Sequence, residues 1–167
     1  MIDSFLKVIE KGIDLVNTRQ KNNKDYFLLI VAPLFEEYEK VAADYFRLFD
    51  SRRIEVKDAV NIREGYLQAR IKVTELAKSY SAESKDKDLI LFFDSVSNFF
   101  YGNLVAREVS TRSDGWYFIN ILTEEKTFNE PQLLLEARDS LESRWETSVH
   151  MFAKLKIKYG SPIGFKV

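Results

Sequence analysis

The stretch Asn129–Lys158, NEPQLLLEARDSLESRWETSVHMFAKLKIK, decides the fold class, because it has the pattern of one long amphipathic helix. Asn129 is a good N-cap, and Pro131 follows at a position where a missing N–H costs nothing. Gly160 and Pro162 end the helix. Its apolar residues recur at helical spacing and predict a stripe that faces a core: Leu134, Ala137, Leu141, Trp145, Val149, Phe152 and Leu155.

A second line of side chains runs along the same helix, beside the apolar stripe. Glu142, Glu146, His150 and Lys154 are four residues apart, so they share one face. Such ladders usually lie in solvent and form weak ion pairs. His150 is also the only histidine of the chain.

The composition is that of one globular domain. The chain has 167 residues, of which 46% are hydrophobic, and this is enough apolar material for a substantial core. Six glycines and three prolines are few for a turn-rich all-β fold. We therefore predict a single helical domain over residues 1–160 and a C-terminal tail over residues 161–167.

The rest of the chain supplies further helices. Apolar periodicity predicts them over Ile2–Lys21, Asp25–Phe49, Asp58–Tyr80 and Asp88–Arg112. Pro33 is expected to kink the second of these. The apolar run 116–122 is predicted to be a short irregular core segment or short helix, because a lone strand would leave its backbone unpaired. The whole chain is predicted to be all-α, an up-and-down bundle of about five helices.

Charge and cysteine content exclude several classes of protein. The 25 basic and 26 acidic residues nearly cancel, so no overall field favours nucleic acid or an acidic membrane. Without cysteine there is no disulfide, thiolate nucleophile or cysteine metal ligand. The apolar run Tyr26–Phe35 is shorter than the about 20 residues that span a bilayer. Charged residues interrupt the N-terminal apolar positions, so we expect a cytoplasmic protein with no membrane partner.

The supply of residues restricts catalysis as well. No glycine-rich phosphate loop and no nucleophile elbow occurs in the sequence. One imidazole cannot complete a zinc site or the di-iron site of a helical bundle. Asp86–Asp88 and Glu124–Glu125 are expected in solvated loops. Neither a metal nor a cofactor is predicted.

One short motif has catalytic content. Arg144 and His150 are separated by five residues in RWETSVH. This spacing resembles the Arg-x4–6-His motif of HEPN-domain ribonucleases, which are all-helical and often dimeric. The resemblance implies metal-independent RNA cleavage by a homodimer, with His150 in proton transfer and Arg144 at the phosphate. Trp145 departs from the family pattern, in which a small polar residue often follows the arginine.

A basic cluster is the other candidate site. Its members lie around the connection between the second and third predicted helices: Arg47, Arg52, Arg53, Lys57 and Arg63. Acidic residues are interleaved with them and lower the local potential. The cluster predicts either a weak nucleic-acid-binding surface or a solvated turn.

Three functions follow, in order of preference. Aromatic-rich helices without a complete catalytic set favour a non-enzymatic helical module that acts through protein contacts. Such a module is an adaptor, an immunity or antitoxin-like partner, or a structural subunit, and its partner is another protein or a second copy. The HEPN-like ribonuclease is the alternative, and the weak nucleic-acid binder is the second alternative.

Overall fold

The computed structural model describes residues 2–18, 22–50, 56–83, 86–101, 104–106, 110–112 and 131–160. Its helices are α1 (Ile2–Thr18), α2 (Asn23–Tyr26), the π-helical turn η1 (Phe27–Val31), α3 (Ala32–Asp50), α4 (Val56–Glu83), α5 (Lys87–Tyr101) and α7 (Pro131–Tyr159). Strands β1 (Leu104–Ala106) and β2 (Ser110–Arg112) form a short antiparallel pair. Because α2, η1 and α3 are continuous, the described part contains five helical rods, which confirms the predicted all-α bundle.

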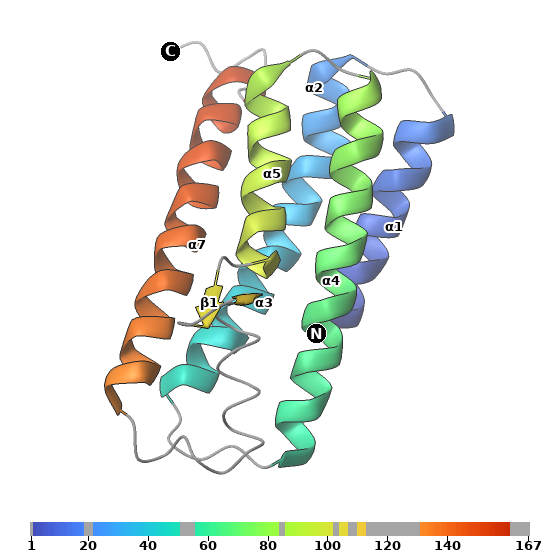
Figure 1. Cartoon of the computed structure of the whole chain (residues 1–167). Helices are drawn as coiled ribbons and strands as arrows, with labels where there is room; N and C mark the ends of the chain where they lie inside the picture. Colours follow the sequence, from blue (N-terminus) through green and yellow to red (C-terminus); the bar gives the residue numbers. More distant parts are fainter. Residues whose placement is uncertain are drawn as a thin grey trace.

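The rods form a closed ring in the order α1, α4, α5, α7 and the α2–η1–α3 rod (Figure 1). The chain direction reverses from each rod to the next along the sequence. A ring with an odd number of alternating rods must contain one parallel pair of neighbours, and here that pair is α1 and α4. Gly12 lies against Leu76 and Gly65 against Ile2, an offset that only parallel helices give. The helix α4 therefore packs on α1 and α5, and not mainly on α3, which precedes it.

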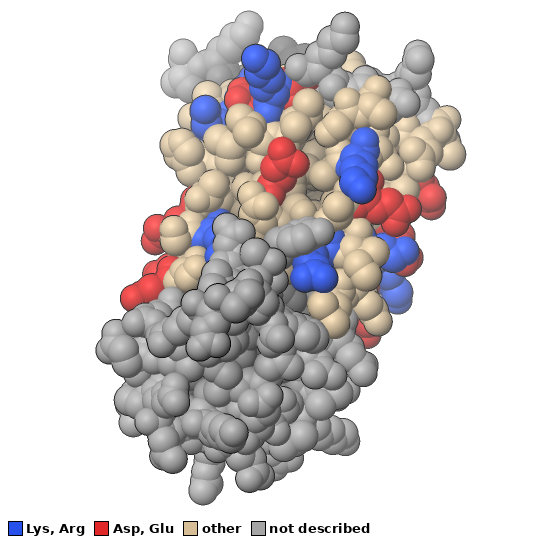
Figure 2. Space-filling model, viewed as in Figure 1, with Lys and Arg blue, Asp and Glu red and all other residues tan. Residues whose placement is uncertain are grey.

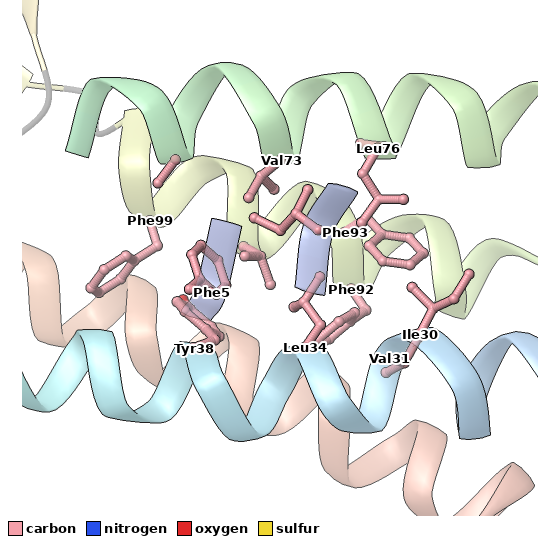
Figure 3. Packing of buried hydrophobic residues seen from close by; sticks show 14 of the residues in the cluster. Phe5, Ile30, Val31, Leu34, Tyr38, Val73, Leu76, Phe92, Phe93 and Phe99 are labelled. Atoms are coloured by element: carbon pink, nitrogen blue, oxygen red, sulfur yellow. The ribbon is translucent and has the colours of Figure 1, made fainter. Parts of the chain in front are cut away.

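Aromatic rings fill the middle of the bundle. The Phe5 ring centroid is 6.1 Å from that of Tyr38 and 5.4 Å from that of Phe100. The Tyr38 ring also meets Trp145 at 4.9 Å. Figure 3 shows Phe5 and Tyr38 directed toward each other between the helices. Each fully buried ring stabilises the fold by about 1.5–3 kcal/mol. Together with the partly buried Trp145, these rings join α1, α3, α5 and α7.

The second rod shows how the chain accommodates Pro33. Proline lacks an N–H and its ring crowds the carbonyl four residues earlier, which is that of Leu29. The π-helical turn Phe27–Val31 lies there and widens the backbone. The rod starts at the N-cap Asn22, whose side chain accepts a hydrogen bond from the Asp25 N–H at 2.8 Å. The predicted long helix is confirmed, with a π turn at the proline.

One predicted helix end is wrong. The helix α5 ends at Tyr101 and does not continue to Arg112. Gly102 follows, and glycine costs about 1 kcal/mol relative to alanine within a helix. The β-branched residues Val105 and Thr111 pair across β1 and β2 instead. The run 116–122 and the tail 161–167 lie outside the described residues.

The apolar stripe predicted on α7 is wrong at one position. Val149 is exposed, and Ser148 is buried in its place. The observed seam alternates steps of four and three residues: Leu141, Trp145, Ser148, Phe152 and Leu155. A polar side chain adds nothing to an apolar pattern, yet the Ser148 hydroxyl has a hydrogen-bond partner in the core. None of the described helices is both long enough and apolar enough to cross a bilayer.

Candidate functional site

A buried hydrogen bond fixes the rotation of α7. The hydroxyls of Tyr38 and Ser148 are 2.9 Å apart and both side chains are fully buried. Turning α7 by one residue would move Ser148 by about 100° and break this bond. On one flank, the Arg138 guanidinium lies 5.5 Å from the centroid of the Phe46 ring of α3. On the other flank, Lys158 donates to Asp86 at 3.0 Å. These contacts decide which side of α7 faces solvent.

The solvent side of α7 carries two parallel lines of exposed side chains. We call it the α7 face, and it consists of Glu142, Glu146, Val149, His150, Ala153, Lys154 and Ile157. Val149, Ala153 and Ile157 form an apolar line with a spacing of four residues. The other four members form a charged line with the same spacing, as the sequence predicted. Equal spacing makes the two lines turn around the helix together.

Charge is segregated along the α7 face. Acidic groups lie in the N-terminal half and basic groups in the C-terminal half. Glu142 accepts from Arg138 at 2.9 Å within the same helix. Within the part of the chain that the structure describes, Glu146, His150 and Lys154 make no ion pair.

Arg144 and His150 lie on different sides of α7. Six residues place them about 120° apart around the helix and about 9 Å apart along it. His150 is exposed on the α7 face. Arg144 is half-buried, on the flank of Lys158 that packs against α5. A single chain therefore does not direct both side chains at one phosphate, and the ribonuclease resemblance stays a prediction about two copies.

The basic cluster is only partly described. Arg47 lies on α3, where it forms an ion pair with Asp44. Lys57 and Arg63 belong to α4, but their side chains are outside the description, as are Arg52 and Arg53 altogether. On the described part of the surface in Figure 2, acidic and basic side chains are interspersed over a largely uncharged face. The cluster stays a prediction.

Asp86, expected in a solvated loop, is instead a buried N-cap, and that expectation is wrong. Its side chain is 4% exposed. The carboxylate accepts from the N–H groups of Asp88 at 2.9 Å and Leu89 at 3.4 Å, in the first turn of α5. Lys158 and the Tyr159 hydroxyl donate to the same carboxylate from α7. An aspartate directly before a helix is the sequence signal that could have identified the cap.

Hydrogen bonds set the charge state of the Asp86 cluster, which comprises Asp86, Lys158 and Tyr159. Burial by itself would raise the pKa of Asp86, but the bonds from Tyr159, Lys158 and the two backbone N–H groups outweigh it and lower the pKa below 3.8. The hydrogen bond to Asp86 raises the pKa of Lys158, and burial raises that of Tyr159. The carboxylate is thus held ionised and joins the end of α7 to the start of α5.

An open hollow of about 500 Å³ adjoins this cluster. It lies between the start of α5, the start of α2 and the end of α7. Lys158 also lies 3.6 Å from Asp88, so the charged groups of the hollow neutralise one another. This arrangement serves the junction of two helices and leaves no surplus charge to attract a ligand. Among the described residues, no group of three or more histidine, aspartate or glutamate side chains is placed to hold a metal ion.

No protein-family model, no curated protein sequence and no solved structure matches this chain.

Proposed function

We propose that this chain is a non-enzymatic helical module that acts through protein contacts, and that it makes them with the α7 face and the adjoining turn η1. One observation carries the proposal. Of the six large apolar side chains exposed in the described part of the chain, four belong to these two elements: Leu28 (48% exposed), Leu29 (47%), Val149 (38%) and Ile157 (80%). Exposed apolar side chains gathered on two adjoining elements of a small protein are characteristic of an interaction site.

Core packing places η1 beside the C-terminal half of α7. The ring of Phe27 stacks on that of Phe152 at 5.8 Å and lies 6.3 Å from that of Tyr159. Leu28 follows Phe27 directly, on the outer side of the same turn. The line of charged side chains on α7 borders the apolar line, which is the usual anatomy of an interface with an apolar centre and a polar rim.

Such a surface suits an adaptor, an immunity or antitoxin-like partner, or a structural subunit. The HEPN-like ribonuclease is the alternative, and it requires Arg144 of one copy to approach His150 of another. RNA cleavage that depends on both residues would support it against the binding module.

Site-specific photo-cross-linking in the cells that make the protein tests the proposal. A benzophenone amino acid is placed at Ile157, and at Ile71 of α4 as a matched control, because both side chains are highly exposed. We expect one predominant protein adduct from position 157, either with the chain itself or with another protein, and none from position 71. Equal adducts at both positions, or none at either, would contradict the proposal.

A further inference from the structure

We propose that the α7 face binds a second copy of the chain, with the two α7 helices antiparallel about a two-fold axis at the level of residue 148. This inference rests on the proposed function and specifies its partner. It follows from the charge pattern, whose positions are self-complementary about that axis, and from the exposed apolar line beside it.

The charge pattern selects the antiparallel direction. About an axis at residue 148, Glu142 faces Lys154 of the partner subunit, because each lies six residues from the axis. Glu146 likewise faces His150 of the partner subunit, each two residues from the axis. In a parallel arrangement, the acidic half of one α7 would lie against the acidic half of the other. Like charges across an interface disfavour that arrangement.

The apolar line adds apolar surface beside the charged pairs of the same interface. Val149 lies one residue from the axis along the helix but about 80° around it from the line of contact, so its two copies flank the contact on opposite sides. Ala153 follows one turn later, and its small side chain permits close approach of the helices. Ile157 is the most exposed large apolar residue of the described chain, and it extends the apolar line toward the end of α7. These three apolar residues keep the spacing of four residues along the α7 face.

A second copy fits this surface because the charged line of the surface complements itself. A two-fold interface uses one patch twice, so every acidic group needs a basic group at the same distance on the other side of the axis. The pairs Glu142/Lys154 and Glu146/His150 meet that condition. Glu146, His150 and Lys154 make no ion pair among the described residues of the chain, and the dimer places a polar partner opposite each of them.

Two charge-reversal variants test the register. The first, Glu142→Lys/Glu146→Lys, makes the charged line wholly basic, and the second, His150→Glu/Lys154→Glu, makes it wholly acidic. Each variant alone places like charges across the axis, and we expect its self-association to weaken by about tenfold or more. An equimolar mixture restores opposite charges at every pair, so we expect a heterodimer at least as tight as the wild-type dimer.

Sedimentation velocity and native mass spectrometry measure these assemblies. The control is Lys40→Glu on α3, which also reverses one end of an intrahelical ion pair, with Glu37 at 3.2 Å, but away from the α7 face. It should leave the dimer unchanged. All the altered side chains are on the surface, so we expect the bundle to stay intact in every variant. Thermal unfolding of each variant checks this.

Two outcomes would overturn the inference. Wild-type protein that stays monomeric at the highest attainable concentration would exclude the second copy as partner. A wild-type dimer that both variants retain would place the interface elsewhere. A photo-adduct from position 157 with a different protein would leave the proposed function standing in either case, so the two failures are distinguishable.

Discussion

Replacing Ser148 by alanine should destabilise the bundle far more than the loss of one small hydroxyl suggests. The Tyr38 hydroxyl lies 2.9 Å from that of Ser148, and neither side chain is exposed. The Tyr38 ring is held against Phe99 at 5.2 Å and Trp145 at 4.9 Å, so it cannot turn its hydroxyl to water. Loss of this buried hydrogen bond should cost about 1–3 kcal/mol.

A double-mutant cycle isolates the bond. Tyr38→Phe should cost less, about 0.5–1.5 kcal/mol, because the serine hydroxyl can donate to the carbonyl one helical turn earlier. The double variant removes both hydroxyls, and we expect it to be more stable than the sum of the single effects predicts, by about 0.5–2 kcal/mol. Ser143→Ala, on the exposed side of the same helix, is the matched control and should change stability by less than about 0.5 kcal/mol.

Urea unfolding monitored by circular dichroism measures all four free energies of unfolding. The slopes must agree among the variants for the comparison to hold. Strictly additive single and double effects would refute the reasoning, because they would mean that the two hydroxyls contribute independently. A cost of Ser148→Ala no larger than that of Ser143→Ala would refute it as well.

Further predictions concern pH, packing and catalysis. Because the folded pKa of Asp86 lies below 3.8, its contribution to stability is present above pH 3.8 and is lost as the pH falls through the folded pKa. Asp86→Asn should therefore lower the free energy of unfolding by about 1 kcal/mol at neutral pH, and the gap to wild type should close on acidification in urea titrations. Burial raises the pKa of Asp94, so ionisation of this carboxyl at neutral pH lowers the stability of the fold. Asp94→Asn should therefore not destabilise the protein at neutral pH. A Cβ at Gly12 would lie 3.0 Å from Cγ2 of Ile30; Gly12→Val should cost about 1–3 kcal/mol in thermal unfolding, and Gly12→Ala less. Wild type and His150→Ala should both leave labelled RNA intact in a gel assay, whereas cleavage by wild type alone would favour the ribonuclease.

The rods could be predicted from the sequence because their signals are local. Pro131 at the start of α7 and Gly160 just after its end need no knowledge of the rest of the fold. The order of the ring could not be predicted, because it depends on which rods fit closely. Gly12 and Gly65 allow α1 and α4 to approach each other closely. The apolar periodicity of one helix does not identify the helix that packs against it.

The polar core positions were missed for a related reason. Ser148 looks like a surface residue until its partner is known, and that partner is 110 positions away in the sequence. Asp86 likewise binds side chains 72 and 73 positions away, so only its role as a helix cap was visible locally. Exposure of the α7 face was predictable only in part. The regular spacing of the charged line predicts a solvent-facing side, but the apolar pattern predicts Val149 in the core, and it is exposed.

The parallel pairing of α1 with α4 has a consequence for how the bundle is made on the ribosome. The first helix emerges long before α4, its main neighbour, and until then only the α2–η1–α3 rod is available to cover its buried residues. At about 5–20 residues per second, that interval lasts seconds. The ring closes last, when α7 meets α3 and the rings of Phe35 and Phe152 stack at 3.9 Å. Until then the nascent chain displays Phe35 and Phe27, so the ribosome-bound intermediate is the form of this protein most exposed to chaperones and to aggregation.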